Sequence, residues 1–133
     1  MDDARGQTPY QRLGEAFFAD LAEGLYRRID GDQRIRELFP SDLGAQSPSV
    51  ADMREFLVQY FGGPSRYSER KGHPRLRARH MRFPIPQTAR DAWLENALGA
   101  LDHAAAAHAA PAELEALVRR YLVEVSQFMI NRA

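Results

Sequence analysis

Two neighbouring stretches decide the fold of this chain of 133 residues: FLVQYFGGPSRYS at residues 56–68 and GHPRLRARHMRF at residues 72–83. The first starts as an apolar helical run and then meets glycine and proline at residues 62–64, which disfavour a helix interior. We therefore expect residues 62–75 to be mostly loop, with a short helix near residues 75–81. So long an irregular segment is unusual in a small helical domain, where helices pack directly on one another. It indicates that something other than a helix packs there.

The rest of the sequence has the composition and periodicity of helices. It contains 20 Ala and 13 Leu but only 11 Val, Ile and Thr together, and this composition favours helix over strand. Apolar residues recur every three or four positions on both sides of the quoted stretches. We expect an all-α domain with a long helix at residues 9–30, bent at Gly14 or Gly24. The other helices are expected at residues 32–38, from Ser47-Pro48 to the glycines at 62–63, at 86–108 and from Pro111 to Phe128, with a loop at 40–47.

Residue types that are missing exclude several classes of protein. Without cysteine the chain has no disulfide framework and no thiolate metal site. The sequence signatures of zinc proteases, serine hydrolases and phosphate-binding loops are also missing. The acidic start lacks the basic and apolar regions of a signal peptide, and no apolar run approaches the ~20 residues that span a bilayer. We expect a single cytoplasmic domain over residues 1–133, with no membrane contact and a flexible tail at residues 1–8.

Positive charge is concentrated in one segment. Residues 61–90 carry eight basic groups and one acid, a net charge of plus seven, whereas both flanking regions are net negative. Such a segment is suited to an anionic partner. Nucleic acid is one candidate, bound by a helical domain through residues 66–82. The neutral balance of the whole chain, with a pI near 6.9, argues against it.

Haem is the other candidate for this segment. It is a flat apolar cofactor that needs aromatic and aliphatic walls, cations for two propionates and a neutral imidazole on its iron. His80 can supply the imidazole, and Met81, Phe83 and Ile85 can wall the same side. The neighbouring arginines disfavour a charged imidazolium and so keep a ligand nitrogen free.

The two quoted stretches resemble the second group of the truncated haemoglobins. The likeness continues in the RDAWL run at residues 90–94, in Leu25-Tyr26 and in Leu38-Phe39-Pro40, and it covers nearly the whole chain. It implies a shortened globin, a two-over-two helical sandwich around haem b. It also implies that His80 is the proximal iron ligand and that Tyr26 and Trp93 hydrogen-bond a diatomic ligand on the distal side.

The same resemblance implies where other residues would act. On the distal side Ser49 is expected at the gate and Met53 one turn further, although the stretch 40–50 is longer than usual. The residues expected to contact the cofactor are Phe39, Phe56, Tyr67, His73, Arg77, Arg79, His80, Met81, Phe83, Ile85 and Trp93, with Tyr67, His73, Arg77 and Arg79 on the propionate side. Many relatives have tyrosine where this chain has Phe39. That change removes one distal hydroxyl and makes a crosslink between two tyrosines impossible.

Three functions remain open from the sequence. The first is reversible binding of O₂, CO and NO for oxygen transport or storage. The second is an enzyme that consumes NO or reduces peroxide, and it would need an external reductase because the sequence has no flavin or NAD motif. The third is the nucleic-acid-binding domain. We expect small diatomic ligands or peroxide as partners, no nucleic acid, and a monomer or homodimer.

Overall fold

The computed structural model describes residues 6–133, and this part of the chain contains helices and no strands. The elements in chain order are α1 (Pro9–Leu13), α2 (Glu15–Asp30), the 3₁₀ helix η1 (Arg36–Leu38), α3 (Pro48–Tyr60), α4 (Arg66–Lys71), α5 (Leu76–His80), α6 (Gln87–Ala107) and α7 (Ala112–Phe128). The prediction of an all-α fold is confirmed. No helix in the described part is long and apolar enough to cross a membrane.

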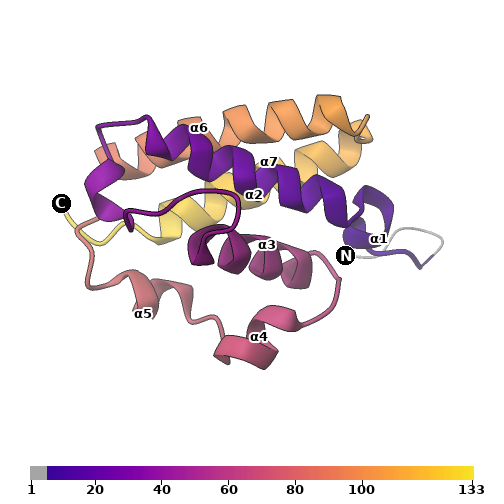
Figure 1. Cartoon of the computed structure of the whole chain (residues 1–133), viewed down its shortest axis with the longest axis horizontal. Helices are drawn as coiled ribbons and strands as arrows, with labels where there is room; N and C mark the ends of the chain where they lie inside the picture. The colour runs from indigo at the N-terminus through magenta and orange to yellow at the C-terminus, as the bar shows by residue number, and fades with distance from the viewer. Residues whose placement is uncertain (1–5) are drawn as a thin grey trace.

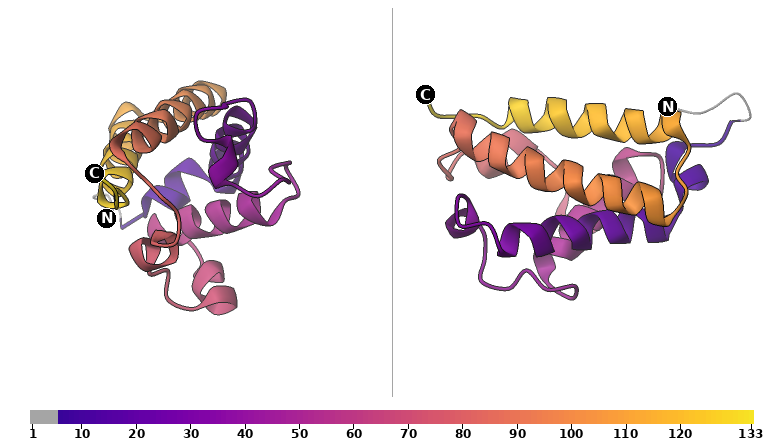
Figure 2. Two further views of the ribbon diagram at one scale, coloured as in Figure 1. Left: turned by 90° about the vertical axis from the view of Figure 1, so that its left-hand side faces the viewer. Right: turned by 90° about the horizontal axis from the view of Figure 1, so that it is seen from above.

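Four long helices form the body of the molecule. Helix α2 packs against both α6 and α3, and α7 packs against α6. Figure 1 shows α4 and α5 on the side of α3 that faces away from α6. The left view of Figure 2 shows the same separation, with the chain between α5 and α6 running from the short helices to the long ones. The short helices therefore lie outside the main helix packing.

The core is built from aromatic rings at one end and from small residues where α2 crosses α6. Phe17, Phe18 and Phe61 are fully buried, and Phe18 stacks on Phe61 with ring centroids 5.7 Å apart. A Cβ atom on Gly24 would lie only 3.4 Å from the Cβ of Ala100. Because neither residue has a bulky side chain, the two helices approach closely. The buried alanines of α6, Ala92, Ala97, Ala100, Ala104 and Ala105, suit this close packing.

Side-chain caps begin helices α3 and α1. The start at Ser47-Pro48 was expected from the sequence. The Ser47 hydroxyl accepts a hydrogen bond from the Val50 amide, and Pro48 follows in the first turn of α3. Thr8 accepts from the Gln11 amide at the start of α1. Of the tail predicted at residues 1–8, residues 1–5 lie outside the described residues, and Thr8 is part of this cap.

Three predicted elements differ in the structure. The helix expected at residues 9–30 is interrupted at Gly14, whose φ of 92° lies in the region that favours glycine. Of the helix expected at 32–38, only η1 forms. Residues 66–71 form α4 and are not loop, because tertiary contacts stabilise them. The Gln59 amide donates to the Ser68 hydroxyl at 2.7 Å and accepts from the Ser68 backbone amide at 2.9 Å.

Candidate functional site

A cavity of about 610 Å³ opens between the short helices and the body of the molecule. Its walls come from α2, α3, α4, α5, α6 and α7 and from the loops around η1 and before α6. Most of the lining is aromatic or aliphatic. A cavity of this size and character is typical of sites for small molecules and cofactors.

His80 lies at the end of α5 and lines this cavity. Its Nδ1 is 2.6 Å from the carbonyl oxygen of Leu76, one turn earlier in the same helix. A carbonyl only accepts, so Nδ1 carries the hydrogen and donates it. The Nε2 of a neutral ring then has a free lone pair, the form in which imidazole binds a metal.

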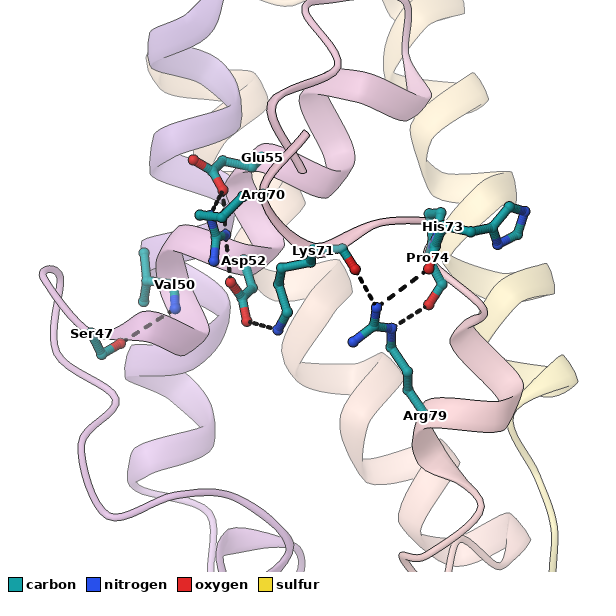
Figure 3. A network of polar contacts seen from close by, with 9 residues as sticks. All are labelled: Ser47, Val50, Asp52, Glu55, Arg70, Lys71, His73, Pro74 and Arg79. Carbon is teal, nitrogen blue, oxygen red and sulfur yellow. Dashed lines mark hydrogen bonds and ion pairs between the residues drawn. The ribbon is translucent and has the colours of Figure 1, made fainter. Parts of the chain in front are cut away.

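The arginine after Ala78 fixes the loop that leads into α5. The Arg79 guanidinium donates to the carbonyl oxygens of Pro74 at 2.7 Å, Lys71 at 2.9 Å and His73 at 3.3 Å, as Figure 3 shows. Arg79 also lines the cavity. These three hydrogen bonds use the several N–H donors of one planar guanidinium. Arg79 therefore both shapes the loop and brings positive charge to the cavity edge.

A second set of polar contacts joins α3 to α4 beside the cavity. Asp52 accepts from the Lys71 ammonium at 2.8 Å and from Arg70 at 2.6 Å, and Arg70 also pairs with Glu55 (Figure 3). Burial raises the pKa of Asp52, but the hydrogen bonds from Lys71 and Arg70 outweigh it, so the pKa lies below its usual value. Asp52 and Lys71 both line the cavity. Asp52 is consequently ionised at neutral pH.

The wall opposite α5 contains two hydrogen-bond donors. Tyr26 of α2 and Trp93 of α6 both line the cavity. Burial, with a smaller contribution from the charge of Asp52, raises the pKa of Tyr26 above its usual value, so its hydroxyl stays protonated. The Tyr26 ring meets Phe39 edge to face, with centroids 6.1 Å apart. This wall therefore combines apolar surface with donors.

The loop that carries Phe39 is held by one side chain. The Arg36 guanidinium donates to Asp30 at 2.9 Å and to the carbonyl oxygens of Pro40 and Ser41 at 2.8 Å each, with a longer contact to the Phe39 carbonyl. These contacts hold the backbone at Phe39 and at the two residues that follow it. Arg36 thus supports the loop that presents Phe39 to the cavity.

Most residues that the sequence pointed to are brought together here, and three are not. The predicted residues that line the cavity are Tyr26, Phe39, Ser49, Met53, Phe56, Tyr67, Arg79, His80, Phe83, Ile85 and Trp93. His73 is exposed, and its Nδ1 accepts from the Arg75 amide at 3.1 Å. Arg77 lies over the Phe128 ring, 5.8 Å from its centroid, and contacts the sulfur of Met81.

Helical geometry explains why Arg77 and Met81 miss the cavity. Residues four apart share a face of a helix. Leu76, Ala78, Arg79 and His80 line the cavity, whereas Arg77 and Met81 share another face of the helix, on which Arg77 lies over the Phe128 ring. Met81 is 45% exposed and does not wall the cavity, and the walls on this side come from Leu76, Phe83 and Ile85.

The contribution of α7 to the cavity was missed from the sequence. Tyr121, Val125 and Met129 line it at intervals of four residues. Tyr121 also stacks on Tyr60 with centroids 3.9 Å apart. The spacing identifies an apolar stripe, but a stripe facing a cavity and a stripe facing other helices have the same sequence pattern. Asp52 also lines the cavity and carries no signal that separates it from ordinary surface charges. Lys71, Arg82 and Arg90 line it too, as part of the basic segment at residues 61–90 that the sequence associates with an anionic partner.

The layered helices and the cavity with its single lining histidine define the class of the protein: it is a globin. The chain belongs to the bacterial-like globin family, whose family profile matches residues 8–126. Members of this family bind haem. The match and the relatives below confirm the resemblance to group II truncated haemoglobins and the two-over-two fold.

Similar proteins come from several bacteria. The group 2 truncated hemoglobin YjbI of Bacillus subtilis is 41% identical over 96 residues, which cover 72% of this chain and 70% of that protein. The solved structure of a hemoglobin from Chloroflexus aurantiacus has a TM-score of 0.86 and 45% identity, and the alignment covers 94% of this chain and 98% of that one. A truncated oxygen-avid haemoglobin from Bacillus subtilis has a TM-score of 0.85 and 34% identity, with 94% and 100% covered.

Proposed function

We propose that the chain holds one haem b in this cavity and binds O₂ and related diatomic ligands, CO and NO, reversibly, for oxygen transport or storage. The observation that carries the proposal is the orientation of His80, whose Nδ1 is engaged by Leu76 and whose Nε2 is left free to bind iron. When bound, haem supplies a ferrous iron that takes up small gases. The chain itself supplies the imidazole, the walls and the polar groups.

The donor set of the cavity fits this group. Phe39, Phe56 and Phe83 offer flat apolar surface to a porphyrin. Lys71, Arg79 and Arg82 bring cations to the same cavity and suit the propionates. Tyr67 lies among them, because the Lys71 ammonium and the Arg79 guanidinium are 5.7 and 5.9 Å from its ring centroid. The absence of a Cys-x-x-Cys-His motif favours non-covalent haem b.

On the distal side, Trp93 and Tyr26 act on the bound ligand. The indole N–H can only donate, and the Tyr26 hydroxyl is held in its protonated form. Two donors that face the ligand favour O₂, which becomes partly anionic when it binds, over CO. Ser49 and Met53, both in α3, stand beside them. The oxygen-avid relative from Bacillus subtilis supports this choice of ligand.

An enzyme that consumes NO or peroxide would use the same residues and would need electrons from an external reductase. Oxygen binding requires no such partner, and it is the function that the site supports best. As part of the same proposal the protein acts in the cytoplasm, which agrees with its lack of cysteine. The residues of the proposed site all come from one chain, so the site would be complete in a monomer and in a homodimer.

Titration of the haem-free chain with haem tests the proposal. We expect an intense Soret band that saturates at one haem per chain, followed by reversible spectral changes when the reduced protein meets O₂ and then CO. Haem absorbance that rises without saturation, or a reduced protein whose spectrum O₂ leaves unchanged, would contradict it.

A further inference from the structure

The segment between α5 and α6 is tied to a residue that follows α7. Asn131 and Ile85 form two hydrogen bonds. The backbone amide of Ile85 donates to the side-chain Oδ1 of Asn131 at 2.9 Å, and the backbone amide of Asn131 donates to the Ile85 carbonyl at 2.9 Å. Its Nδ2 donates to the carbonyl oxygens of Phe83 at 3.0 Å and His80 at 3.3 Å. One side chain therefore holds both ends of the segment from His80 to Ile85.

This tie acts at the C-terminal end of α5, and Arg79 holds the loop at the other end. Helix α5 takes no part in the main helix–helix contacts of the described part of the chain. The last carbonyl groups of any helix lack partners within the helix. The His80 carbonyl is such a group, and besides the Phe83 amide it has Asn131 as its donor. An amide side chain suits this place because it donates and accepts at once.

We propose that Asn131 is a positioning residue for His80. By fixing the carbonyl of His80 and the chain up to Ile85, it sets how far α5 stands from the opposite wall and hence where the His80 Nε2 lies in the cavity. The proposal rests on the proposed function, in which that nitrogen binds the haem iron. Asn131 lies beyond residues 8–126, to which the family profile is matched.

Two variants separate the donor and acceptor roles of the side chain. Asn131→Ala removes both, whereas Asn131→Asp keeps an oxygen for the Ile85 amide and loses the donors to His80 and Phe83. The matched control is Gln127→Ala, because Gln127 is an exposed amide at the end of α7. Hydrogen exchange of the Ile85 amide is followed in the purified chain with and without added haem. The iron–histidine stretching band of the reduced, haem-loaded protein is recorded by resonance Raman spectroscopy.

In Asn131→Ala we expect Ile85 exchange to rise about tenfold, the change that loss of one hydrogen bond produces, and the iron–histidine band to shift or broaden. In Asn131→Asp exchange should stay near that of the wild type while the band changes as in Asn131→Ala. Gln127→Ala should alter neither. An unchanged band in both Asn131 variants would overturn the positioning role, even if exchange and thermal stability change.

The experiment distinguishes a failure of the proposed function from a failure of the positioning role of Asn131. Absence of an iron–histidine band in the wild-type protein would contradict His80 as the iron ligand. The exchange rates measured without haem would then decide alone whether Asn131 anchors α5: faster Ile85 exchange in Asn131→Ala supports the anchor, and unchanged exchange overturns it.

Discussion

Trp93 and Tyr26 lie in helices far apart in sequence, yet they line one cavity opposite α5. A hydrogen bond to a charged or partly charged acceptor contributes about 1.5–3 kcal/mol. We therefore expect Trp93→Phe to raise the O₂ dissociation rate roughly tenfold to a hundredfold. CO is nearly neutral when bound, so its dissociation should change much less. Stopped-flow ligand displacement measures both rates.

Tyr26→Phe is the companion variant. Its hydroxyl also accepts hydrogen bonds, so it can pair with Trp93 in some ligand states and should have a smaller effect in the same direction. Equal changes in the O₂ and CO rates of Trp93→Phe would mean that the indole acts through packing or access, and the hydrogen-bond role would have to be withdrawn.

Arg79 and Arg77 are neighbours in α5 with different surroundings. Arg79 lines the cavity and holds the preceding loop through three carbonyl groups, whereas Arg77 lies over Phe128 and does not line the cavity. We expect Arg79→Ala to speed haem transfer to an acceptor globin by up to about fivefold, since an exposed charged pair contributes about 0–1 kcal/mol. Arg77→Ala should leave the rate close to that of the wild type. Equal acceleration in both variants would contradict this division.

At the scale of elements, α4 is tied to α3 by charge. Because the pKa of Asp52 is lowered in the folded chain, its contribution to stability is fully present above the unfolded-state value, near 3.9, and is lost as the pH falls through the lower folded value. We expect Asp52→Asn to reduce the unfolding free energy by roughly 1 kcal/mol at pH 7. The difference from wild type should shrink below about pH 4.

Urea denaturation at pH 7, 5 and 3 tests this dependence. Glu124→Gln is the control, because Glu124 is an exposed carboxylate of α7 outside the ion pairs found among residues 6–133. A difference between Asp52→Asn and wild type that persists unchanged at pH 3 would show that the α3–α4 contact does not depend on the ionised carboxylate.

The long helices were predictable from sequence, and the short ones only in part. Caps and prolines mark α3, α6 and α7, so their observed starts lie within a residue or so of the expected ones. Helix α4 was missed because its six residues follow a glycine–proline break and carry four charges, a pattern that is typical of loops. Its stability comes from the buried ring of Tyr67 and the contacts to Gln59, which no local pattern reveals.

The same limit applies to the site. His80, Tyr26 and Trp93 could be proposed because a long motif surrounds them. The direction of each side chain within α5 depends on how the helix docks, and so Met81 and Arg77 were expected in a cavity that they do not line. Likewise the face that α7 turns to the cavity follows from its packing on α6.

Across the whole molecule, acidic and basic residues that lie far apart in the sequence form ion pairs in the folded chain. Arg66 pairs with Glu15, Arg70 with Glu55, and Lys71 with Asp52, so acids from the first half of the chain offset part of the basic segment. Strong non-specific binding of DNA requires many free cations on one surface. We expect the haem-loaded protein to show no tight binding of duplex DNA at 150 mM salt in a fluorescence anisotropy titration. Tight, salt-sensitive binding would favour the nucleic-acid function instead.

The proposed function of the molecule depends most on His80 as the haem ligand. Absorption spectra of the reduced protein and of its CO form, recorded for the wild type and for His80→Ala, test this most directly. His73→Ala is the matched control, because His73 is an exposed histidine outside the cavity lining. We predict that His80→Ala loses or grossly alters both spectra and that His73→Ala keeps them. Wild-type spectra in His80→Ala would show that another group holds the iron and would contradict the proposed role of His80.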